Sequence, residues 1–355
     1  MTRTTRRAAL AALPMLTLIL GADAPAPKGY VCGRAAASIQ VDGKLDDPAW
    51  KDAPWTDDFV DIEGDAKPKP RFRTRAKMLW DDSDFYIAAE LSEPHVWGTL
   101  KDHDAVIFAD NDFEVFIDPD GDNHDYFELE INALATEWDL LLEKPYRDGG
   151  PALNSWEIPG LREAVHVQGT LNDPTDRDQG WTVELALPWA ALAPLANRPA
   201  PPRDGDRWRV NFSRVEWEHA VEAGRYRKVP DRREDNWVWS PQGAIDMHRP
   251  ERWGYVQFSD QSPARLPGFR PDPSLPARVR LMAVYRAQKA FHDRTKTWAG
   301  TLEALDLPQP PGGPPITLRP TLGGYEARIT VGPPIVEKPR TLAIRQDSRL
   351  TLTPE

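Results

Sequence analysis

Carboxylate and amide side chains are frequent in the stretch from Asn111 to Trp138. Apolar and polar residues alternate in 113–117 and again in 127–132, which is the period of a half-buried β-strand. If these two strands pair in the simplest register, one outward face carries Glu114, Glu128, Glu130 and Asn132. Such a face could hydrogen-bond the hydroxyl groups of a ligand, although a solvated sheet face would show the same alternation.

The segment between the two strands has the composition of a cation-binding loop. Alternating carboxylates flank Gly121 at four positions, Asp118, Asp120, Asp122 and Asp125. Calcium takes oxygen ligands at roughly 2.3–2.6 Å, so these side chains predict a structural calcium site. The loop lacks the bidentate glutamate that ends an EF-hand loop, and a solvated acidic turn is the alternative.

Catalysis by paired carboxylates is a second interpretation of the same face. Glu128 and Glu130 lie two residues apart on one strand, with their Cβ atoms roughly 7 Å apart, so an acid and a base could flank a glycosidic bond. Neighbours on one strand rarely flank a substrate, however. The sequence contains no G-x-S-x-G, H-E-x-x-H, Walker or Rossmann pattern. A non-catalytic role is therefore the preferred prediction.

Composition and charge limit the compartment and the partners. The net charge of -11 over 355 residues excludes nucleic acid and anionic membrane surfaces as partners, because both would repel the protein. The charged residues 1–7 and the apolar run 8–20 have the order of an export signal, predicted over residues 1–26. That run is too short to span a bilayer, so a secreted or periplasmic protein is expected. The single cysteine, Cys32, is expected to be a small buried residue.

The pattern of the whole chain predicts a mainly β protein in two parts. Many short alternating segments with few helices indicate an antiparallel β-sandwich over residues 28–259, with its first strand at 38–41. Five prolines between 262 and 277 mark a linker, predicted over 260–277. Residues 278–355 then read as one helix over 278–307, with Gln288 interrupting its apolar face, followed by a small sheet. This makes a small C-terminal α+β module.

Four motifs of the large domain resemble, in order and spacing, the carbohydrate-binding module family 9, a β-sandwich of the wider DOMON-like group. They are DGKLDDPAW (42–50), LWDDSDFY (79–86), NDFEVFID (111–118) and PERWG (250–254). The resemblance implies a secreted, non-catalytic carbohydrate-binding domain with structural calcium. It also implies two Trp rings that sandwich a terminal sugar, and acidic, amide and arginine side chains that hydrogen-bond its hydroxyls.

Carried over residue by residue, this resemblance places the acidic contact of the family at Glu114. The other three contacts differ in this chain: Phe108 stands in place of the first Trp, Glu130 in place of the arginine, and Met247 in place of the second Trp. Sugar recognition needs an aromatic face against C–H groups and fixed polar groups for the hydroxyls. Further candidates are thus Asn132 and Arg214 for hydrogen bonding, and Trp138, Trp237 and Trp239 for stacking. A place in the core is the alternative for each indole.

Two weaker resemblances complete the set of expectations. Some DOMON-like proteins hold haem b between a Met and a second axial ligand, and Met247-His248 occupies the matching loop; a Met in the core is the alternative. Residues 278–353 loosely resemble the globular part of type IV pilin-like proteins. The C-terminal module is therefore predicted either to dock on an envelope protein partner or to act as a stabilising cap.

Overall fold

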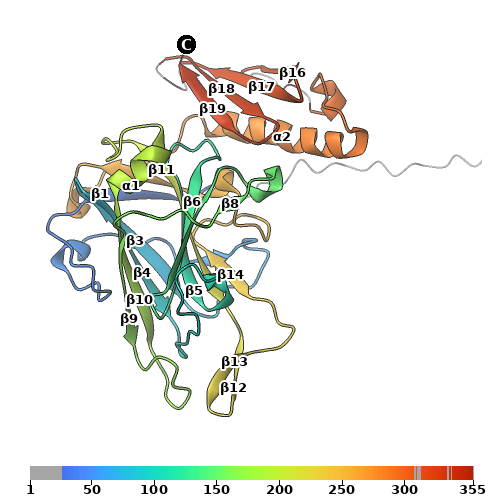
Figure 1. The fold of residues 1–355 in the computed structure, drawn as a ribbon. Helices are drawn as coiled ribbons and strands as arrows, with labels where there is room; N and C mark the ends of the chain where they lie inside the picture. Colours follow the sequence, from blue (N-terminus) through green and yellow to red (C-terminus); the bar gives the residue numbers. More distant parts are fainter. Residues whose placement is uncertain (1–25, 308, 310–312, 334–335, 337, 355) are drawn as a thin grey trace, which may run out of the picture.

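The computed structural model describes residues 26–307, 309, 313–333, 336 and 338–354. The predicted export signal, residues 1–26, lies outside the described residues apart from Ala26. In the described part of the chain, no helix is both long and apolar enough to cross a membrane. The molecule has two parts, a large β domain and a small module stacked on one end of it (Figure 1).

One sheet of 13 strands forms the large domain, and it curls so that its two halves face each other as the layers of a sandwich. Across the first layer run β8 (Ala152–Leu153), β7 (Glu137–Leu142), β6 (Tyr126–Asn132), β5 (Asp112–Asp118), β11 (Arg207–Glu216) and β15 (Gly254–Ser259). The second layer continues through β1 (Gly29–Arg34), β3 (Thr74–Trp80), β4 (Asp84–Ser92), β10 (Gly180–Pro188) and β9 (Arg162–Gln168). The predicted mainly β fold is confirmed.

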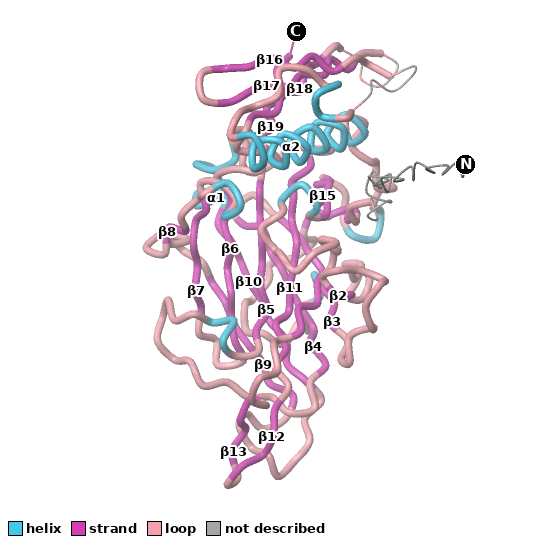
Figure 2. The backbone as a smooth tube through the Cα atoms, turned by 90° about the vertical axis from the view of Figure 1, so that its right-hand side faces the viewer, coloured by secondary structure: helices cyan, strands magenta, loops and turns pink. Residues whose placement is uncertain are grey.

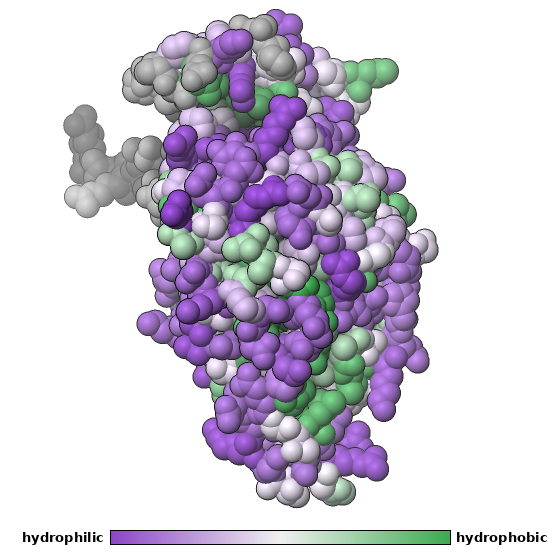
Figure 3. Space-filling view, turned by 90° about the vertical axis from the view of Figure 1, so that its left-hand side faces the viewer, coloured by the Kyte–Doolittle hydropathy of each residue, from purple (hydrophilic) through white to green (hydrophobic). Residues whose placement is uncertain are grey.

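Shorter elements complete this domain. Two strands, β14 (Asp235–Val238) and β2 (Val60–Asp61), extend the first layer beside β11, and the helix α1 (Trp189–Ala196) follows β10 directly. A hairpin of β12 (His219–Glu222) and β13 (Arg225–Lys228) projects from the end opposite the small module (Figure 2). On the face shown in Figure 3, hydrophilic residues predominate and hydrophobic patches are small, as expected of a chain with 28% charged residues.

The first strand differs from the prediction. Residues 38–41 form no strand, and the first strand is instead β1, whose buried Tyr30 and Cys32 join the main core. Strand β1 runs parallel to both of its neighbours, β15 and β3, so the sandwich is antiparallel except at this corner. Ile39 and Val41 pack as loop residues against a second cluster around Trp50. Alternation over four residues cannot separate an edge strand from a loop that packs on the sheet.

Alternate residues of the two layers build the main core. Phe113, Val115 and Phe212 from the first layer share one hydrophobic cluster with Ile87 and Val183 from the second, and all are fully buried. Because side chains alternate across a strand, the residues between them on β5 and β6 point away from this core. The carboxylates of the central stretch therefore lie on the outer face of the first layer.

The small module packs one helix against a four-stranded sheet. Its elements are α2 (Leu275–Thr295), β16 (Ile316–Thr321), β17 (Gly324–Val331), β18 (Arg340–Arg345) and β19 (Leu350–Pro354). The predicted helix is too long, because the chain leaves the helix at Lys296, whose φ is +58°. Gln288, the polar residue on the apolar face, is fully buried. Its amide donates to Ala299 O and accepts from Ala299 N, so it fastens the segment that follows the helix.

Helix α2 lies between the small sheet and the sandwich (Figures 1 and 2). Asp148 of the sandwich joins the two parts. The Asp148 carboxylate accepts hydrogen bonds from Tyr285 Oη at 2.6 Å, Ser348 Oγ at 2.7 Å and Lys289 Nζ at 3.2 Å. Its side chain is only 1% exposed. The predicted linker thus leads into a module that is docked, and α2 begins within the predicted linker at Leu275.

Replacing Asp148 is expected to loosen this docking. In Asp148→Ala, three donors lose one charged acceptor, which we expect to cost about 2–4 kcal/mol of docking free energy. Limited proteolysis should then cleave between residues 260 and 275 faster than in the wild type. Asp293→Ala removes an exposed carboxylate from helix α2, which carries Tyr285 and Lys289, and serves as the matched control. Equal cleavage rates in both variants would contradict a docking role for Asp148.

Candidate functional site

The outer face of the first layer brings three predicted residues into one row. Glu114 of β5 lies directly opposite Glu130 of β6, and Glu130 lies opposite Trp138 of β7. Glu128 precedes Glu130 by two residues on β6 and therefore lies on the same face. The alternation of the sequence predicts this register, and the structure confirms it. An indole and three carboxyl groups thus lie on one face of three neighbouring strands.

A cavity of about 310 Å³ opens on this face. Five of the predicted ligand-binding residues line it: Phe108, Glu114, Glu130, Trp138 and Met247. Other lining residues, which the sequence did not single out as ligand-binding, are Tyr146, Glu234 and Asp246; Glu128 and His248 also line the cavity. The missed residues lie outside the strands, where no strand period marks the direction of a side chain.

An aromatic surface forms one side of the cavity. Phe108 belongs to the short 3₁₀ helix η2 (Ile107–Ala109) and is 41% exposed. Its ring is nearly parallel to that of Trp138, with 6.5 Å between centroids and 30° between planes. The Phe108 N–H donates to Glu130 Oε2 at 2.8 Å, which fixes the aromatic turn against the carboxyl row. The arrangement presents a flat apolar face beside hydrogen-bonding groups.

The carboxyl groups of this cavity are buried and close together. Burial raises the pKa of Glu114 to about 7. Burial, and then repulsion from neighbouring carboxylates, raises the pKa of Glu128 and of Glu130 well above the usual range. Burial, with the nearby Arg147, lowers the pKa of His248 to about 4, so this imidazole is neutral near pH 7 and does not balance the acids.

The prediction that Arg214 contacts a ligand is wrong. Ser213 lies opposite Glu114, so Ser213 faces outward and the next residue of β11, Arg214, points between the layers. Arg214 is fully buried, and its Nη2 lies 2.7 Å from Glu93 Oε2 and 2.8 Å from Glu216 Oε2. Arg214 is a structural residue of the core.

Trp237, in β14, and Trp239, directly after it, also lie in the core, and the prediction that they stack on a ligand is wrong. Trp237 lies opposite Arg214 and therefore shares its inward direction, with 3% exposure. Trp239 is 1% exposed and packs on Phe212, with ring centroids 5.9 Å apart. A Cβ atom on Gly254 would approach the Trp239 ring to 2.4 Å, so this position requires glycine. Of the two alternatives for these residues, the core is the one realised.

Asn132 lies on the predicted face but outside the cavity. It is fully buried at the end of β6, where its amide donates to Leu100 O at 2.9 Å. Its Oδ1 accepts from Leu134 N at 2.9 Å and from Thr136 N at 3.1 Å. Asn132 therefore holds the turn between β6 and β7, which positions Trp138, and the prediction of a direct ligand contact is wrong.

The predicted calcium loop brings three of its four carboxylates together. Oxygen atoms of Asp118, Asp120 and Asp122 lie within 4.8 Å of one another, whereas Asp125 stands apart. Burial, and then the charges of Asp120 and Asp122, raises the pKa of Asp118 well above the usual range. Its two oxygens already accept from Gly121 N and Asn123 N. The residues therefore fit a hard cation in part.

Arg349 of the small module supplies a positive charge to the same loop. Its Nε lies 2.8 Å from Asp122 Oδ2, and its Nη2 lies 3.5 Å from Asp125 Oδ2. His124 and Asn123 of the loop also hydrogen-bond the backbone of Asp347 and Ser348. The acidic loop is therefore part of the surface on which the C-terminal module docks.

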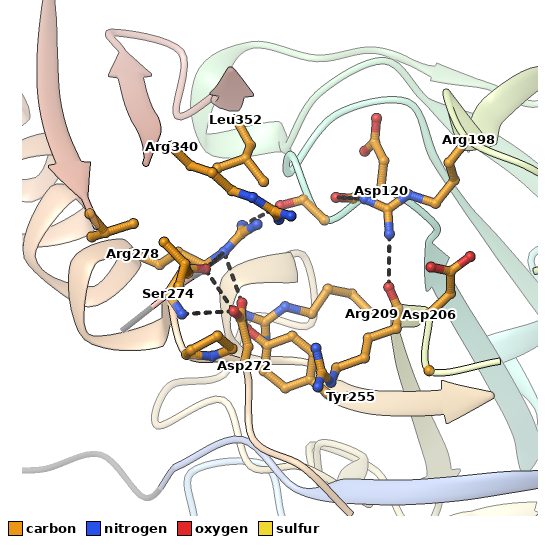
Figure 4. A pocket seen from close by; sticks show the side chains of 16 residues that line it. Asp120, Arg198, Asp206, Arg209, Tyr255, Asp272, Ser274, Arg278, Arg340 and Leu352 are labelled. Atoms are coloured by element: carbon orange, nitrogen blue, oxygen red, sulfur yellow. Dashed lines mark hydrogen bonds and ion pairs between the residues drawn. The ribbon is translucent and has the colours of Figure 1, made fainter. Parts of the chain in front are cut away.

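A second cavity, of about 210 Å³, lies at this junction between the two parts. Figure 4 shows arginines converging on it, with Arg209 from β11, Arg278 from α2 and Arg340 from β18. Tyr255 is its aromatic residue, but the Arg209 guanidinium covers the ring at 3.7 Å from its centroid. The first cavity alone combines an exposed aromatic face with a carboxyl row, as judged over the described residues, so it is the candidate binding site.

The loop predicted for haem contributes both of its residues to the first cavity. Met247 lines the cavity, and His248 Nδ1 pairs with Tyr126 Oη at 3.1 Å. Two adjacent residues of one loop cannot ligate opposite faces of one haem iron. Among the described residues that line the cavity, none offers a second Met or His. The geometry gives no support to haem binding.

Comparisons with known proteins give one family match and several similar solved structures. Residues 41–201 match the family model described as carbohydrate family 9 binding domain-like. A search of curated proteins gave no match. Among solved structures, a carbohydrate-binding module family 9 from Caldicellulosiruptor kristjanssonii is similar in complexes with cellotriose and with glucose, with TM-scores of 0.45 and 0.44. Each is 15% identical and covers 69% of this chain and 100% of that one.

A protein of proposed carbohydrate-binding function from Bacteroides uniformis ATCC 8492 is similar at 15% identity, over 66% of this chain and 100% of that one, with a TM-score of 0.49. The family match falls on the elements that carry the site, because β5, β6 and β7 lie within the matched residues. The region 41–201 of this chain is therefore similar to the carbohydrate family 9 binding domain-like family, as the sequence motifs indicate.

Proposed function

We propose that the sandwich domain binds a saccharide without cleaving it, in the cavity on the outer face of β5, β6 and β7. The observation that carries this proposal is the row of Trp138, Glu130 and Glu114 across three strands, inside a region similar to a carbohydrate-binding family. Phe108 and Trp138 offer an apolar face to the C–H groups of a sugar ring. The carboxyl oxygens accept hydrogen bonds from its hydroxyls.

Truncating Trp138 tests this function. Trp138→Ala removes the larger ring of the aromatic surface, so we expect the affinity for a bound oligosaccharide to fall roughly tenfold or more. Isothermal titration calorimetry on the full chain, with ligands first identified on a glycan array, measures this change. Trp55→Ala removes a half-buried indole outside the cavity and should leave the affinity unchanged. Absence of binding to any saccharide would overturn the proposal.

The same proposal places the protein outside the cytoplasm, as a secreted or periplasmic protein. Its support is the sequence of residues 1–26, which has the order of an export signal. An envelope protein partner for the C-terminal module stays a prediction. The docking of that module through Asp148 and Arg349 supports its other predicted role, that of a stabilising cap.

Calcium is proposed as a structural ion at the carboxylates of Asp118, Asp120 and Asp122. An ion that binds only the folded protein stabilises it by about 2.7 kcal/mol at a hundred times its dissociation constant. We therefore expect calcium to raise the unfolding temperature and a chelator to reverse the change. Asp120→Asn should remove the response, and Arg349→Ala should enlarge it, because a competing cation is gone. Asp82→Asn, in another acidic turn, is the control. An unfolding temperature that does not change when calcium is added would contradict the proposed calcium site.

A glycan-active hydrolase is the second candidate, and the raised pKa of Glu128 and Glu130 is the observation that favours it. Against it, Glu128, Glu130 and Glu114 lie on two adjacent strands and form one wall of the cavity. Two catalytic carboxylates need to flank the bond that they cleave. Release of sugars from a polysaccharide by the wild type, lost in Glu128→Gln, would favour the hydrolase over the binding domain.

A further inference from the structure

The candidate cavity has an unusual balance of charge. Five of its lining residues are acidic: Glu114, Glu128, Glu130, Glu234 and Asp246. Within the described chain, no lysine or arginine lines it, and its one basic group is His248. Oligosaccharides built from neutral hexoses need hydrogen-bonding partners but no such excess of one charge. The lining therefore points to the charge of the ligand.

The carboxyl groups lack cations of their own. Glu114 and Glu128 are each only 5% exposed, and neither pairs with a lysine or arginine of the described residues. His248 Nε2 lies 3.8 Å from Glu128 Oε2. Behind the row, Asp112 is fully buried with its Oδ2 unpaired among the described residues, and its carboxylate lies within 4.8 Å of those of Glu114 and Glu130. Burying ionised groups in this way is costly unless a cation reaches them.

The nearby cations are engaged elsewhere. Lys228 is close enough to Asp112 and Glu234 to interact electrostatically with both. Its Nζ nevertheless lies over the Trp217 ring, 3.5 Å from the centroid, and Lys228 does not line the cavity. Arg147 forms two hydrogen bonds with Glu251, at 2.9 and 3.1 Å. The positive charge that would match the carboxyl row must therefore come from outside the described chain.

An ammonium group on a sugar ring meets both features of the cavity. Its three N–H donors match closely spaced carboxylate oxygens, and charge-assisted hydrogen bonds of this kind are roughly twice as strong as neutral ones. The ring that carries it can lie on Phe108 and Trp138, whose faces also attract a cation. A bare divalent cation would use the carboxylates but would leave the aromatic surface without a partner.

Resting on the carbohydrate-binding function proposed above, we propose that this cavity selects amino sugars, that is, saccharides with a free ammonium group such as oligomers of 2-amino-2-deoxyglucose, over neutral glucans. Glu130 is the residue that sets this selectivity, because it stands between Glu114 and Trp138 in the row. The chemical class is a cationic saccharide, bound by carboxylates and an aromatic face together.

Calorimetry on the full chain at neutral pH tests the proposal with four probes: a trisaccharide of 2-amino-2-deoxyglucose, its N-acetylated form, cellotriose, and calcium chloride alone. We expect the free amine to bind roughly ten- to a hundredfold more tightly than the other two sugars, and to weaken as salt is added. Equal or tighter binding of cellotriose would overturn this inference and leave the proposed function intact. Failure of all three sugars would overturn the proposed function itself. Competition of calcium with the amine, without a sugar preference, would assign a metal site and overturn the amino-sugar selectivity.

Variants separate charge from fold. Glu130→Gln keeps the shape of the side chain and should lower the affinity for the amino trisaccharide about tenfold, while changing that for cellotriose by less than about threefold. Glu222→Gln makes the same chemical change on the exposed β12–β13 hairpin and should change neither affinity. Thermal unfolding verifies that each variant is folded, and Glu114→Gln provides a second test if Glu130→Gln is not. An unchanged affinity for the amine in both cavity variants would overturn the proposal.

Discussion

Arg214→Ala is expected to destabilise the sandwich by about 3–5 kcal/mol, because it leaves the buried carboxyl group of Glu93 without a cation and that of Glu216 with only Arg71, whose Nη2 lies 3.8 Å from Glu216 Oε1. Arg214 also donates to Thr74 Oγ1 and Ser92 O of the facing layer, so its loss removes these hydrogen bonds between the two layers. Urea denaturation of the full chain measures the change in the free energy of unfolding.

The pH dependence of this loss identifies its cause. Burial, and then the charge of Glu216, raises the pKa of Glu93 well above its usual range. Without Arg214, which lowers the pKa of Glu93, the Glu93 carboxyl group takes up a proton more readily, so the destabilisation should shrink as the pH falls. Arg73→Ala removes an arginine whose side chain is 48% exposed and pairs with Glu90, and should cost less than about 1 kcal/mol. A similar cost in both variants would contradict the buried ion pair as the source of the effect.

Glu114→Gln is expected to stabilise the protein in alkaline solution. Burial raises the pKa of Glu114 from 4.5 in its ordinary state to about 7. A folded pKa above the unfolded one means that the folded protein holds a proton that the unfolded chain releases. The contribution of this proton to the free energy of unfolding is therefore fully present below the pKa of Glu114 in the unfolded chain. It is lost as the pH rises through the pKa of Glu114 in the folded protein. For this shift the loss is roughly 3 kcal/mol.

Glutamine has no proton to lose, so the advantage of Glu114→Gln should grow between about pH 5 and pH 8. Because Glu128 and Glu130 titrate together with Glu114, the slope of the wild type belongs to the cluster of three. Unfolding in urea at a series of pH values measures both curves. Glu222→Gln, exposed on the hairpin, should follow the wild type at every pH. Parallel curves for Glu114→Gln and the wild type would contradict an uncompensated carboxyl cluster.

The register of the central strands could be predicted from the sequence because alternation is a local property. Glu114, Glu130 and Trp138 fall on one face in the sequence and in the structure. Arg214 shows where local reasoning ends. Whether Arg214 shares the face of Glu114 depends on the register between β11 and β5, which are almost a hundred residues apart in the sequence. A shift of this register by one residue moves a side chain from the ligand-binding face into the core.

Residue type alone did not separate the aromatic surface of the site from the core. Trp138 and Trp239 are the same residue on strands or strand ends of one layer, yet the first lines the cavity and the second is 1% exposed in the core. Residues outside the strands, such as Tyr146 and Asp246, had no periodic signal at all. The docking of the C-terminal module depends on single contacts, such as that between Arg349 and Asp122. Neither the composition nor the spacing of residues predicts such contacts.

The parallel pairing of β1 bears on how this chain folds. Gly29–Gly33 lies beside Tyr255–Ser259, so the first strand of the described chain closes the sheet against the last strand of the same domain. During synthesis from the N-terminus, β1 can pair early with β3 at only two of its residues, and more than two hundred residues must follow before β15, its longer partner, exists. Contacts of such long sequence separation slow folding, because the entropy of closing the loop is lost before the contact forms. Any shortening of the chain before residue 259 leaves β1 with an open edge.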